Sequence, residues 1–573
     1  MQSGKKGIWP FPDANSLGQD AIAGLVIAAM LIPQGMAYAL LAGLPAQVGL
    51  YASLLPTAAY ALFGSSRYLA VGPVAVVSLM VATATALLSQ RHGLDPVPVA
   101  ASLALASGAI LMLMGLLRLG FITHFLSRPV LLGFMGGVAV LIGLSQLPHA
   151  LGIPVEVREP FALVGELAGN WQSFSLPTLL LAIGTVLLIR LFSGPLARLL
   201  QPRLPTAGLI VSRLGALAAV VLGITLALHT GLGERTALVG EIPRGLPSFA
   251  LPPIELAWLM ELLGMAFLIS LIGLMESVSV GRALAARDGE DIQPNRELLG
   301  LGASNLVAGL SAAYPVTGGL ARTLVARDAG AKSPLAGVFA AGGVLLALLF
   351  ATPVLAMLPR AILAGIILLA VLPLLDFASI RDTWRHNRPD ATVALISFAS
   401  VLILGVELGL LTGLAVSLAL LLWRISQPHV AEVGRVPGTE HFRNIRRHQV
   451  ETRPGLSMIR VDESLQFPNS RFLRDTLLEH LDTHPETRDL VLVCSAINEI
   501  DSTALETLEE LVRSLAARGI RLHLSEVKGP VLDRLRRAGF PALLAPGRIF
   551  FTNQAAFEEI GADKPQQDQS VAQ

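Results

Sequence analysis

The stretch Tyr314–Thr323, YPVTGGLART, interrupts an otherwise apolar chain with a proline, two adjacent glycines and an arginine. A charged side chain at membrane depth is costly and usually functional. A similar break occurs at Leu69–Val74, LAVGPV, where a strand-like run meets a proline that can open a new helix. Two interrupted spans in corresponding halves of a chain indicate the binding site of a transporter.

The composition is typical of a polytopic helical membrane protein. Of the 573 residues, 53% are hydrophobic and 14% are charged, and the mean hydropathy is +0.64. Soluble domains carry about 25% charged residues. The single cysteine, Cys494, excludes an internal disulfide framework and a multi-cysteine metal site. We expect the first apolar span to be retained, because no cleavable signal pattern precedes it.

A shift in composition near Trp423 divides the chain. We expect a cytoplasmic segment over residues 1–20, a membrane domain over 21–427, a small α/β domain over 428–562 and a disordered tail over 563–573. The membrane domain contains fourteen apolar segments, near residues 21–41, 48–63, 74–88, 99–117, 130–147, 176–191, 209–228, 256–275, 298–312, 320–327, 335–355, 361–375, 391–404 and 408–423.

Arginines follow the even-numbered segments. The positive-inside rule then places both termini in the cytoplasm of a multi-pass protein of the inner or plasma membrane. The arginines concerned are Arg118, Arg128, Arg190, Arg198, Arg203, Arg282, Arg287, Arg296, Arg381, Arg385 and Arg388. Breaks in the third and tenth of fourteen segments predict two inverted repeats of seven helices, since an odd repeat reverses the orientation.

The two breaks together predict an anion site. A half-helix that starts within the membrane exposes unpaired backbone N–H groups and the positive end of its dipole. The candidates are the helix starts after Pro73 and after Gly319, and Arg322 adds a full positive charge. The structural alternative is that Arg322 pairs with a carboxylate or extends to the interface.

Two further polar residues stand in apolar segments. Glu276 ends the run 266–275, where it can carry a proton through a transport cycle, neutralise Arg322, or merely pair with Arg282. Gln34 follows Pro33 and either offers an amide to the same cavity or stabilises a proline kink.

Several motifs, in order along the chain, resemble the SulP family of sulfate permeases and related anion transporters. They are Asp20–Leu25, Ile32–Ala39, Gly49–Ser53, Phe63–Arg67, Val71–Ala75, Ser78–Met80, Asn295–Leu298, Gly302, Asn305, Tyr314–Gly319 and Gly330–Lys332. The resemblance implies an all-α membrane domain of fourteen segments in a 7+7 inverted repeat, a core domain moving against a gate domain, a homodimer and a C-terminal cytoplasmic STAS domain.

The resemblance also implies that the anion binds between the third and tenth helices. The implied site residues are Gln34, Tyr38, Val74, Ala75, Gly318, Gly319, Leu320, Ala321 and Arg322. Family members often carry Ser-Arg-Ser in the tenth helix, whereas this chain reads Ala321-Arg322-Thr323. A hydroxyl ligand is therefore missing at residue 321.

The favoured function is proton-coupled sulfate symport, with Glu276 as the coupling residue. Sodium-coupled bicarbonate members of the family carry a hydroxyl one turn further on, where this chain has Val280. The alternatives are a sodium-coupled bicarbonate or C4-dicarboxylate transporter, a passive exchanger or channel, a nucleobase transporter and a non-transporting sensor. No credible nucleophile and base, metal-ligand cluster or phosphate-binding loop is present, so we expect no enzyme, no cofactor, no resident metal and no nucleic-acid partner.

The C-terminal region has the pattern of a small α/β domain. Residues 457–461, 490–494 and 520–524 predict strands, and 503–518 predicts a helix. The segment Asn498–Leu505 resembles the STAS loop that is phosphorylated in related regulatory proteins, which implies Ser502 and Thr503 as possible regulatory sites. Asp501 or Ser502 is equally suited to cap the helix.

Overall fold

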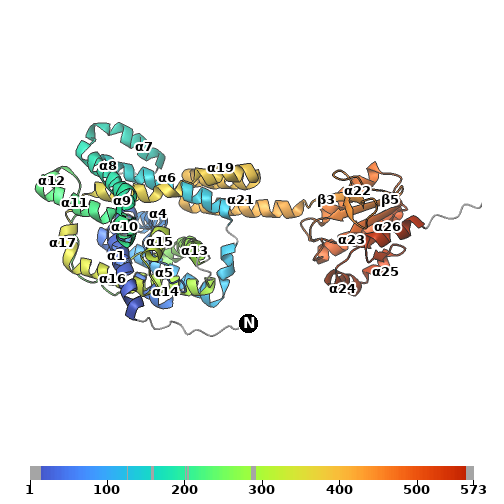
Figure 1. The fold of residues 1–573 in the computed structure, drawn as a ribbon, viewed down its shortest axis with the longest axis horizontal. Coiled ribbons are helices and arrows are strands. Elements are labelled where there is room, and N and C mark those ends of the chain that lie inside the picture. The colour runs from blue at the N-terminus through green and yellow to red at the C-terminus, as the bar shows by residue number, and fades with distance from the viewer. Residues whose placement is uncertain are drawn as a thin grey trace, which may run out of the picture. The chain divides into compact units, whose positions relative to one another are not determined.

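The computed structural model describes residues 14–124, 127–155, 160–200, 202, 205–253, 255–285 and 292–562 (Figure 1). The chain divides into two compact units, Met1–Ser417 and Leu418–Gln573. The expected tail, most of the expected N-terminal segment, Arg203 and Arg287 lie outside the described residues. The expected domain limits stay a prediction.

The first unit is mostly helical, and every predicted apolar segment coincides with one helix or with consecutive helices. The main helices are α1 (Ala14–Leu41), α2 (Ala46–Ala52), α3 (Leu55–Phe63), α4 (Ala75–His92), α5 (Pro96–Leu116), α6 (Arg128–Leu151), α8 (Leu176–Leu191), α10 (Pro205–Arg213), α11 (Gly215–His229), α13 (Leu256–Ala285), α14 (Pro294–Leu310), α15 (Leu320–Asp328), α16 (Leu335–Leu346), α17 (Thr352–Leu355), α18 (Arg360–Val371), α20 (Arg388–Leu404) and α21 (Val406–Ser426). Within the described ranges, nine helical spans are long and apolar enough to cross a membrane. The helices of the two interrupted segments, α4 and α15, are not among them.

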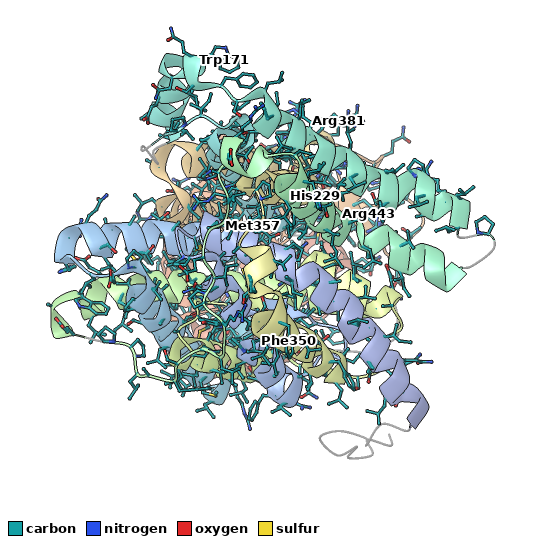
Figure 2. All side chains as sticks on the ribbon, turned by 90° about the vertical axis from the view of Figure 1, so that its left-hand side faces the viewer. Trp171, His229, Phe350, Met357, Arg381 and Arg443 are labelled. Atoms are coloured by element: carbon teal, nitrogen blue, oxygen red, sulfur yellow. The ribbon has the colours of Figure 1, made fainter. Side chains whose placement is uncertain are left out.

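Apolar side chains cover much of the outer surface of this unit. Phe350 and Trp171, both labelled in Figure 2, are 75% and 58% exposed. Many large apolar side chains of α8, α11 and the first part of α21 are exposed as well, including Leu187, Val221 and Leu408. A soluble protein rarely exposes so much apolar surface, whereas a lipid bilayer covers it without cost.

Helix packing agrees with a repeat in which each segment corresponds to the one seven segments later. The first segment, α1, packs against the eleventh, α16, and the eighth, α13, packs against the fourth, α5. The ninth segment, α14, packs against α5, and the second, α3, packs against α16. If each segment is replaced by its counterpart seven places away, the contact between α1 and α16 becomes that between α13 and α5, and the contact between α14 and α5 becomes that between α3 and α16. An inverted repeat requires this correspondence.

The helices of this unit form two groups. Helices α1, α3, α5, α13, α14 and α16 pack mainly on one another and form the core group. Helices α6, α8, α11, α18 and α20 form the gate group. Contacts between the groups run mainly through α1, which packs on α18 and α11.

Glycines bring α5 and α14 into backbone contact inside the core group. A Cβ atom at Gly108 would lie 2.5 Å from the backbone nitrogen of Leu306, and one at Gly302 would lie 2.8 Å from that of Met112. Any larger residue at either position would push the helices apart. Small residues at such crossings are the usual basis of close helix packing in membranes.

Two buried carboxylates fasten loops of the core group. Glu297 is fully buried, accepts hydrogen bonds from the Tyr60 hydroxyl at 2.7 Å and the Ser65 N–H at 3.1 Å, and also accepts from the Ser65 hydroxyl. Asp20 is equally buried and accepts from the backbone N–H groups of Lys332 at 2.7 Å and Ser333 at 3.1 Å. These bonds account for the acidic residues in the motifs at residues 20–25 and 295–298.

The second unit has a six-stranded sheet in the order β4-β3-β5-β6-β7-β8. Strands β5 (Leu456–Val461), β6 (Asp489–Val493), β7 (Arg521–Ser525) and β8 (Ile549–Phe550) run parallel, and β3 (Val430–Arg435) is antiparallel to both β4 (Phe442–Asn444) and β5. The helices are α22 (Ser470–Thr483), α23 (Ser502–Ala517), α24 (Gly529–Arg537), α25 (Phe540–Leu544) and α26 (Asn553–Ala562). The predicted strands and the predicted helix each lie within one residue of these bounds.

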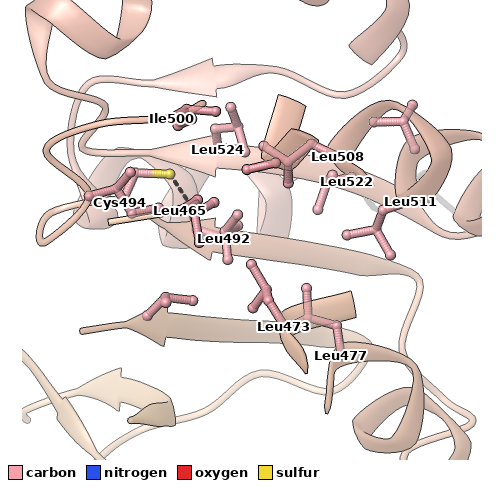
Figure 3. Close-up of a cluster of buried hydrophobic side chains, with 14 of the residues drawn as sticks. Leu465, Leu473, Leu477, Leu492, Cys494, Ile500, Leu508, Leu511, Leu522 and Leu524 are labelled. Carbon is pink, nitrogen blue, oxygen red and sulfur yellow. Dashed lines mark hydrogen bonds between the residues drawn. The ribbon is translucent and has the colours of Figure 1, made fainter. Parts of the chain in front are cut away.

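Both faces of this sheet are covered, as parallel strands require. Figure 3 shows one face, where Leu473 and Leu477 of α22 and Leu508 of α23 pack against strand residues such as Leu492. Val491 and Val493, the alternate residues of β6, belong to the cluster on the other face.

Cys494 lies in the first cluster, where its thiol donates to the Leu492 carbonyl (Figure 3). Burial raises the pKa of the Cys494 thiol to about 12, so the thiol is unreactive while the sheet is closed. The start of α23 is capped by Asp501, whose carboxylate accepts from the Ala504 N–H at 2.8 Å. Ser502 and Thr503 are exposed in the first turn of α23, and their regulatory role stays a prediction.

Candidate functional site

The two interrupted segments meet in a short antiparallel ladder. Strand β1 (Val71–Gly72) pairs with β2 (Thr317–Gly318), so that Val71 lies opposite Gly318 and Gly72 lies opposite Thr317. The Gly319 N–H extends the ladder by donating to the Ala70 carbonyl at 3.2 Å. Because the strands are antiparallel, α4 and α15 lead away from this ladder in opposite directions, each with its N-terminus beside it.

Side chains of neighbouring helices hold the extended segment Val316–Gly318, which contains β2 and is called the β2 arm below. The Asn305 amide of α14 donates to the Val316 carbonyl and accepts from the Val316 N–H, both at 2.9 Å. The Ser277 hydroxyl of α13 accepts from the Gly318 N–H at 2.9 Å. Extended backbone at membrane depth is stable only where such partners replace water.

The extended segment Ala70–Gly72, which contains β1 and is called the β1 arm below, is held in the same way. The Thr57 hydroxyl of α3 donates to the Val71 carbonyl at 2.9 Å. The Thr323 hydroxyl of α15 accepts from the Ala70 N–H at 3.2 Å and donates to the Gly319 carbonyl at 2.7 Å. The Thr323 hydroxyl, two residues from position 321 along the chain, is therefore already bonded to the ladder and does not replace the missing hydroxyl.

Both half-helices begin without a side-chain cap. Val74 is the N-cap of α4 and Gly319 that of α15, and neither helix receives a side-chain capping bond. The first intrahelical bonds run from the Ser78 N–H to Val74 and from the Thr323 N–H to Gly319, each at 3.0 Å. The earlier N–H groups of each helix therefore lack helical partners and point toward the ladder end. They belong to Ala75, Val76, Val77, Leu320, Ala321 and Arg322.

Arg322 lies in the first turn of α15 and is 2% exposed. Its Nη1 donates to the Pro73 carbonyl at 2.6 Å, which links α15 to the segment between β1 and α4. Its Nε and Nη2 have no hydrogen-bond partner in the described part of the chain. A Cβ at Gly319 would lie 2.8 Å from Nη2, so the guanidinium packs directly on that glycine. Arg322 is thus bonded to a backbone carbonyl and not to a carboxylate.

Glu276 of α13 is the acidic counterpart of this arginine. Its Oε2 is buried and has no hydrogen-bond partner among the described residues. The charges of Glu276 and Arg322 interact electrostatically, although no ion pair within 4.0 Å joins them in the described structure. The next residue, Ser277, holds the β2 arm, so Glu276 lies one residue from the ladder's own support.

Helix α1 packs against the ladder with a face that carries both apolar and polar side chains. A Cβ at Gly72 would lie 3.1 Å from the Leu31 side chain, which places this face of α1 against β1. Gln34 and Tyr38 follow at helical spacing on the same face, and both are buried. Tyr38 also interacts electrostatically with Arg322 and Glu276. A second tyrosine, Tyr314, shares a hydrogen bond of 3.1 Å between its hydroxyl and that of Ser78.

The remaining predicted site residues fall into two groups. Val74, Ala75, Gly318 and Gly319 are buried around the ladder. Leu320 is 48% exposed and Ala321 is exposed, so their side chains lie outside the buried group around Arg322. The sequence named Asn305 only as part of a family motif and assigned no role to Ser277 or Thr57, because a hydroxyl that holds an extended segment has no spacing signature.

The sequence matches known protein families and named relatives over most of its length. The profile of the Sulfate permease family matches residues 17–397, and that of the STAS domain matches residues 447–556. "Sulfate transporter 4.1, chloroplastic" of Arabidopsis thaliana is 35% identical over 550 residues, covering 93% of this chain and 78% of that protein. A probable sulfate transporter of Mycobacterium tuberculosis is 36% identical over 541 residues, covering 94% of each protein.

Solved structures show the same fold. The overall structure of SLC26A9 matches with a TM-score of 0.85 at 23% identity, covering 96% of this chain and 91% of the other. The transmembrane domain of a cyanobacterium bicarbonate transporter, BicA, matches with a TM-score of 0.60 at 22% identity, covering 70% of this chain and 98% of the other. With both domains matched in order and close relatives aligned over nearly its whole length, the chain belongs to the sulfate permease family and carries a C-terminal STAS domain.

Proposed function

We propose that this protein is a proton-coupled sulfate symporter that binds the anion at the ends of α4 and α15. One observation carries the proposal: Arg322 is buried beside two uncapped helix N-termini and keeps Nε and Nη2 without partners in the described structure. A buried cation with unused donors is costly, and an anion is the ligand that satisfies both the charge and the N–H groups.

Sulfate fits this set of donors. Its oxygens accept hydrogen bonds only, and the site offers guanidinium and backbone N–H donors together with the amide of Gln34. Several relatives that align over most of this chain are named sulfate transporters, which supports the same substrate. Because Ala321 has no hydroxyl, the anion must be recognised by the guanidinium, the backbone N–H groups and the Gln34 amide. This set of donors favours ligands that accept hydrogen bonds from backbone N–H groups.

Proton coupling follows from the position of Glu276. An ionised Glu276 and a bound anion compete for the positive charge of Arg322. Protonation of Glu276 removes the competing charge, so proton and anion favour each other's binding, and linkage makes this effect reciprocal. Sodium would need several oxygen ligands. The nearby Ser277 hydroxyl already accepts from Gly318 and shares a hydrogen bond with Thr317, which favours the proton.

The division into two helix groups supports alternating access. The side chains named at the site come from the core group, from α4 and α15, or from the segments that lead into these two half-helices, and α4 and α15 pack against α1 and α13. A movement of this assembly against the gate group would carry an intact site from one side of the membrane to the other. We further propose a homodimer in a lipid bilayer, in the inner or plasma membrane, with both termini in the cytoplasm.

The test is uptake of radiolabelled sulfate into proteoliposomes, with and without an inward proton gradient. Uptake that rises with the gradient and collapses with a protonophore supports symport. Unlabelled bicarbonate, fumarate and succinate, each with and without sodium, serve as competitors. If sulfate does not enter while a competitor displaces bound label or enters itself, the substrate assignment is wrong although the anion site stands. Flux independent of the gradient would indicate a passive exchanger or channel.

A further inference from the structure

Two histidines and a glutamate meet in the second unit, in residues that the transport function does not use. Glu432 lies on β3, His480 lies in the last turn of α22, and His484 directly follows that helix. All three side chains are half-buried. Each offers one ligand atom, and these atoms lie within 4.8 Å of one another. The two imidazole rings stack with centroids 4.2 Å apart.

Hydrogen bonds fix the orientation of both rings. Nδ1 of His484 bonds to the His480 carbonyl at 2.9 Å and to the Thr483 hydroxyl at 3.0 Å. Nε2 of His480 bonds to the hydroxyl of buried Ser457 at 3.1 Å, which in turn bonds to the Thr487 hydroxyl at 3.0 Å. One nitrogen of each ring is therefore held by the protein, and Nε2 of His484 and Nδ1 of His480 remain for another ligand. Metal-binding histidines show this arrangement, in which the second nitrogen bonds to a carbonyl or hydroxyl and sets the ring.

The local charge suits a cation. Two carboxylates, Glu432 and Glu486, and one cation, Arg446, act electrostatically on His480 besides the neighbouring His484. The balance of fixed charge is negative before a metal binds.

We propose that Glu432, His480 and His484 form a binding site for a divalent transition metal, with zinc as the best match. Zinc prefers imidazole and carboxylate ligands, and three protein ligands leave a fourth position for water. The metal would join β3 to the end of α22, two elements that the chain connects only through β4 and β5. The sequence predicts no metal site, because Glu432 lies far from the histidine pair along the chain.

The test measures zinc binding to the purified full-length protein in detergent, without a histidine tag and after treatment with a chelator. Isothermal titration should show one zinc ion per chain. Glu432→Gln and His484→Ala should each weaken this binding by at least about 10-fold, because loss of even an outer partner of a metal ligand costs about 10-fold to 100-fold. His441→Ala is the matched control, because His441 is an exposed histidine of the same unit outside the cluster.

Three results would overturn the proposal. The first is no saturable zinc binding below about 10 µM, the level expected of weak surface sites. The second is binding that Glu432→Gln and His484→Ala leave unchanged. The third is an equal loss in His441→Ala. Glu432→Gln keeps the shape of the side chain, so it separates a lost ligand from a misfolded domain, and the circular dichroism spectrum of each variant verifies the fold.

Discussion

Buried charges are treated in opposite ways in the two units. In the second unit, Asp489 is buried and accepts from Arg521 through Nε at 2.7 Å and Nη2 at 2.9 Å, and from His523 at 3.0 Å. In the first unit, Arg322 is more deeply buried than Arg521 but uses only Nη1. A fully paired buried charge is part of the fold, whereas a buried charge with unused donors is prepared for a ligand.

The same contrast occurs within the first unit between two glutamates. Glu297 accepts from Tyr60 and Ser65 through both of its oxygens. Glu276 leaves Oε2 without a partner among the described residues. Glu276 ends an apolar run and Glu297 lies in the first turn of α14 beside Arg296, so the sequence singles out Glu276 without showing which of the two carboxylates is paired. Their surroundings assign Glu297 to the fold and Glu276 to the transport cycle that we propose.

The largest effect is expected from Arg322→Ala, which should abolish sulfate binding. The substitution removes two free donors to the anion, and charge-assisted hydrogen bonds contribute about 1.5–3 kcal/mol each. Affinity should therefore fall by at least about 100-fold. Equilibrium binding of labelled sulfate to the purified protein measures it directly. Arg322→Lys should restore part of the affinity, because it keeps the charge while losing the fork of donors. Near-normal binding by the alanine variant would place the anion elsewhere.

The next effect concerns coupling, through Glu276→Gln. Glutamine cannot exchange a proton, so the proton gradient should no longer drive sulfate accumulation, while sulfate binding persists. In the wild type, one coupled proton can support about tenfold accumulation for each unit of pH difference. Accumulation in the glutamine variant should fall to about the equilibrium ratio without a gradient. Counterflow of labelled against unlabelled sulfate provides the control for intact binding and turnover.

Glu297→Gln sharpens the comparison between the two glutamates. Its amide cannot accept from Tyr60 and Ser65 through both positions, so this variant should lower thermal stability and leave proton dependence intact. Gradient-driven uptake that survives in Glu276→Gln and disappears in Glu297→Gln would reverse the two assignments.

Much of this structure could be predicted from the sequence. Hydropathy indicated each helical segment, and the breaks at Pro73 and Gly319 placed the starts of α4 and α15 within a few residues. Hydrophobic pattern also gave the strands of the second unit, because buried parallel strands are short continuous apolar runs.

The details of the site depend on contacts that are distant in the chain. The bond from Arg322 to Pro73 joins residues 249 positions apart, and those from Asn305 and Ser277 to the β2 arm have no local pattern. Nor could the sequence show that Glu297 is paired and that Glu276 is not, since pairing depends on which neighbours the fold supplies. The His480 and Glu432 cluster was missed for the same reason.

A smaller effect is expected from alanine at the two glycines beside Arg322. A Cβ at Gly319 would lie 2.8 Å from the guanidinium Nη2, too close for van der Waals contact, so Arg322 must shift. A Cβ at Gly72 would lie 3.5 Å from the same atom, which is an ordinary contact. Gly319→Ala should weaken sulfate binding by about tenfold, which corresponds to about 1.4 kcal/mol, and Gly72→Ala by less. Equal losses in both variants would show that the position of the guanidinium does not set the affinity.

The smallest effect is expected in the second unit, from Asp489→Asn. Burial opposes the ionisation of Asp489, but hydrogen bonds from His523 and Arg521 outweigh it and hold the pKa of Asp489 below its usual value. A carboxylate with a lowered pKa stabilises the fold above the unfolded pKa of about 3.9, and this stability is lost as the pH falls through the folded pKa. Because Arg521 is 43% exposed, we expect a loss of only about 1–2 kcal/mol in the unfolding free energy at pH 7.

The difference between Asp489→Asn and wild type should therefore persist at pH 5 and shrink below about pH 4. Urea unfolding of the full-length protein, followed by pulsed deuterium labelling of β6 and β7, isolates this unit from the membrane helices. Labelling of Cys494, the only cysteine in the chain, gives an independent readout at pH 7, because the thiol becomes accessible only when the sheet opens. Sulfate binding should not change, because Asp489 belongs to a paired network of the fold. A loss of sulfate binding in this variant would break the distinction between paired and unpaired buried charges.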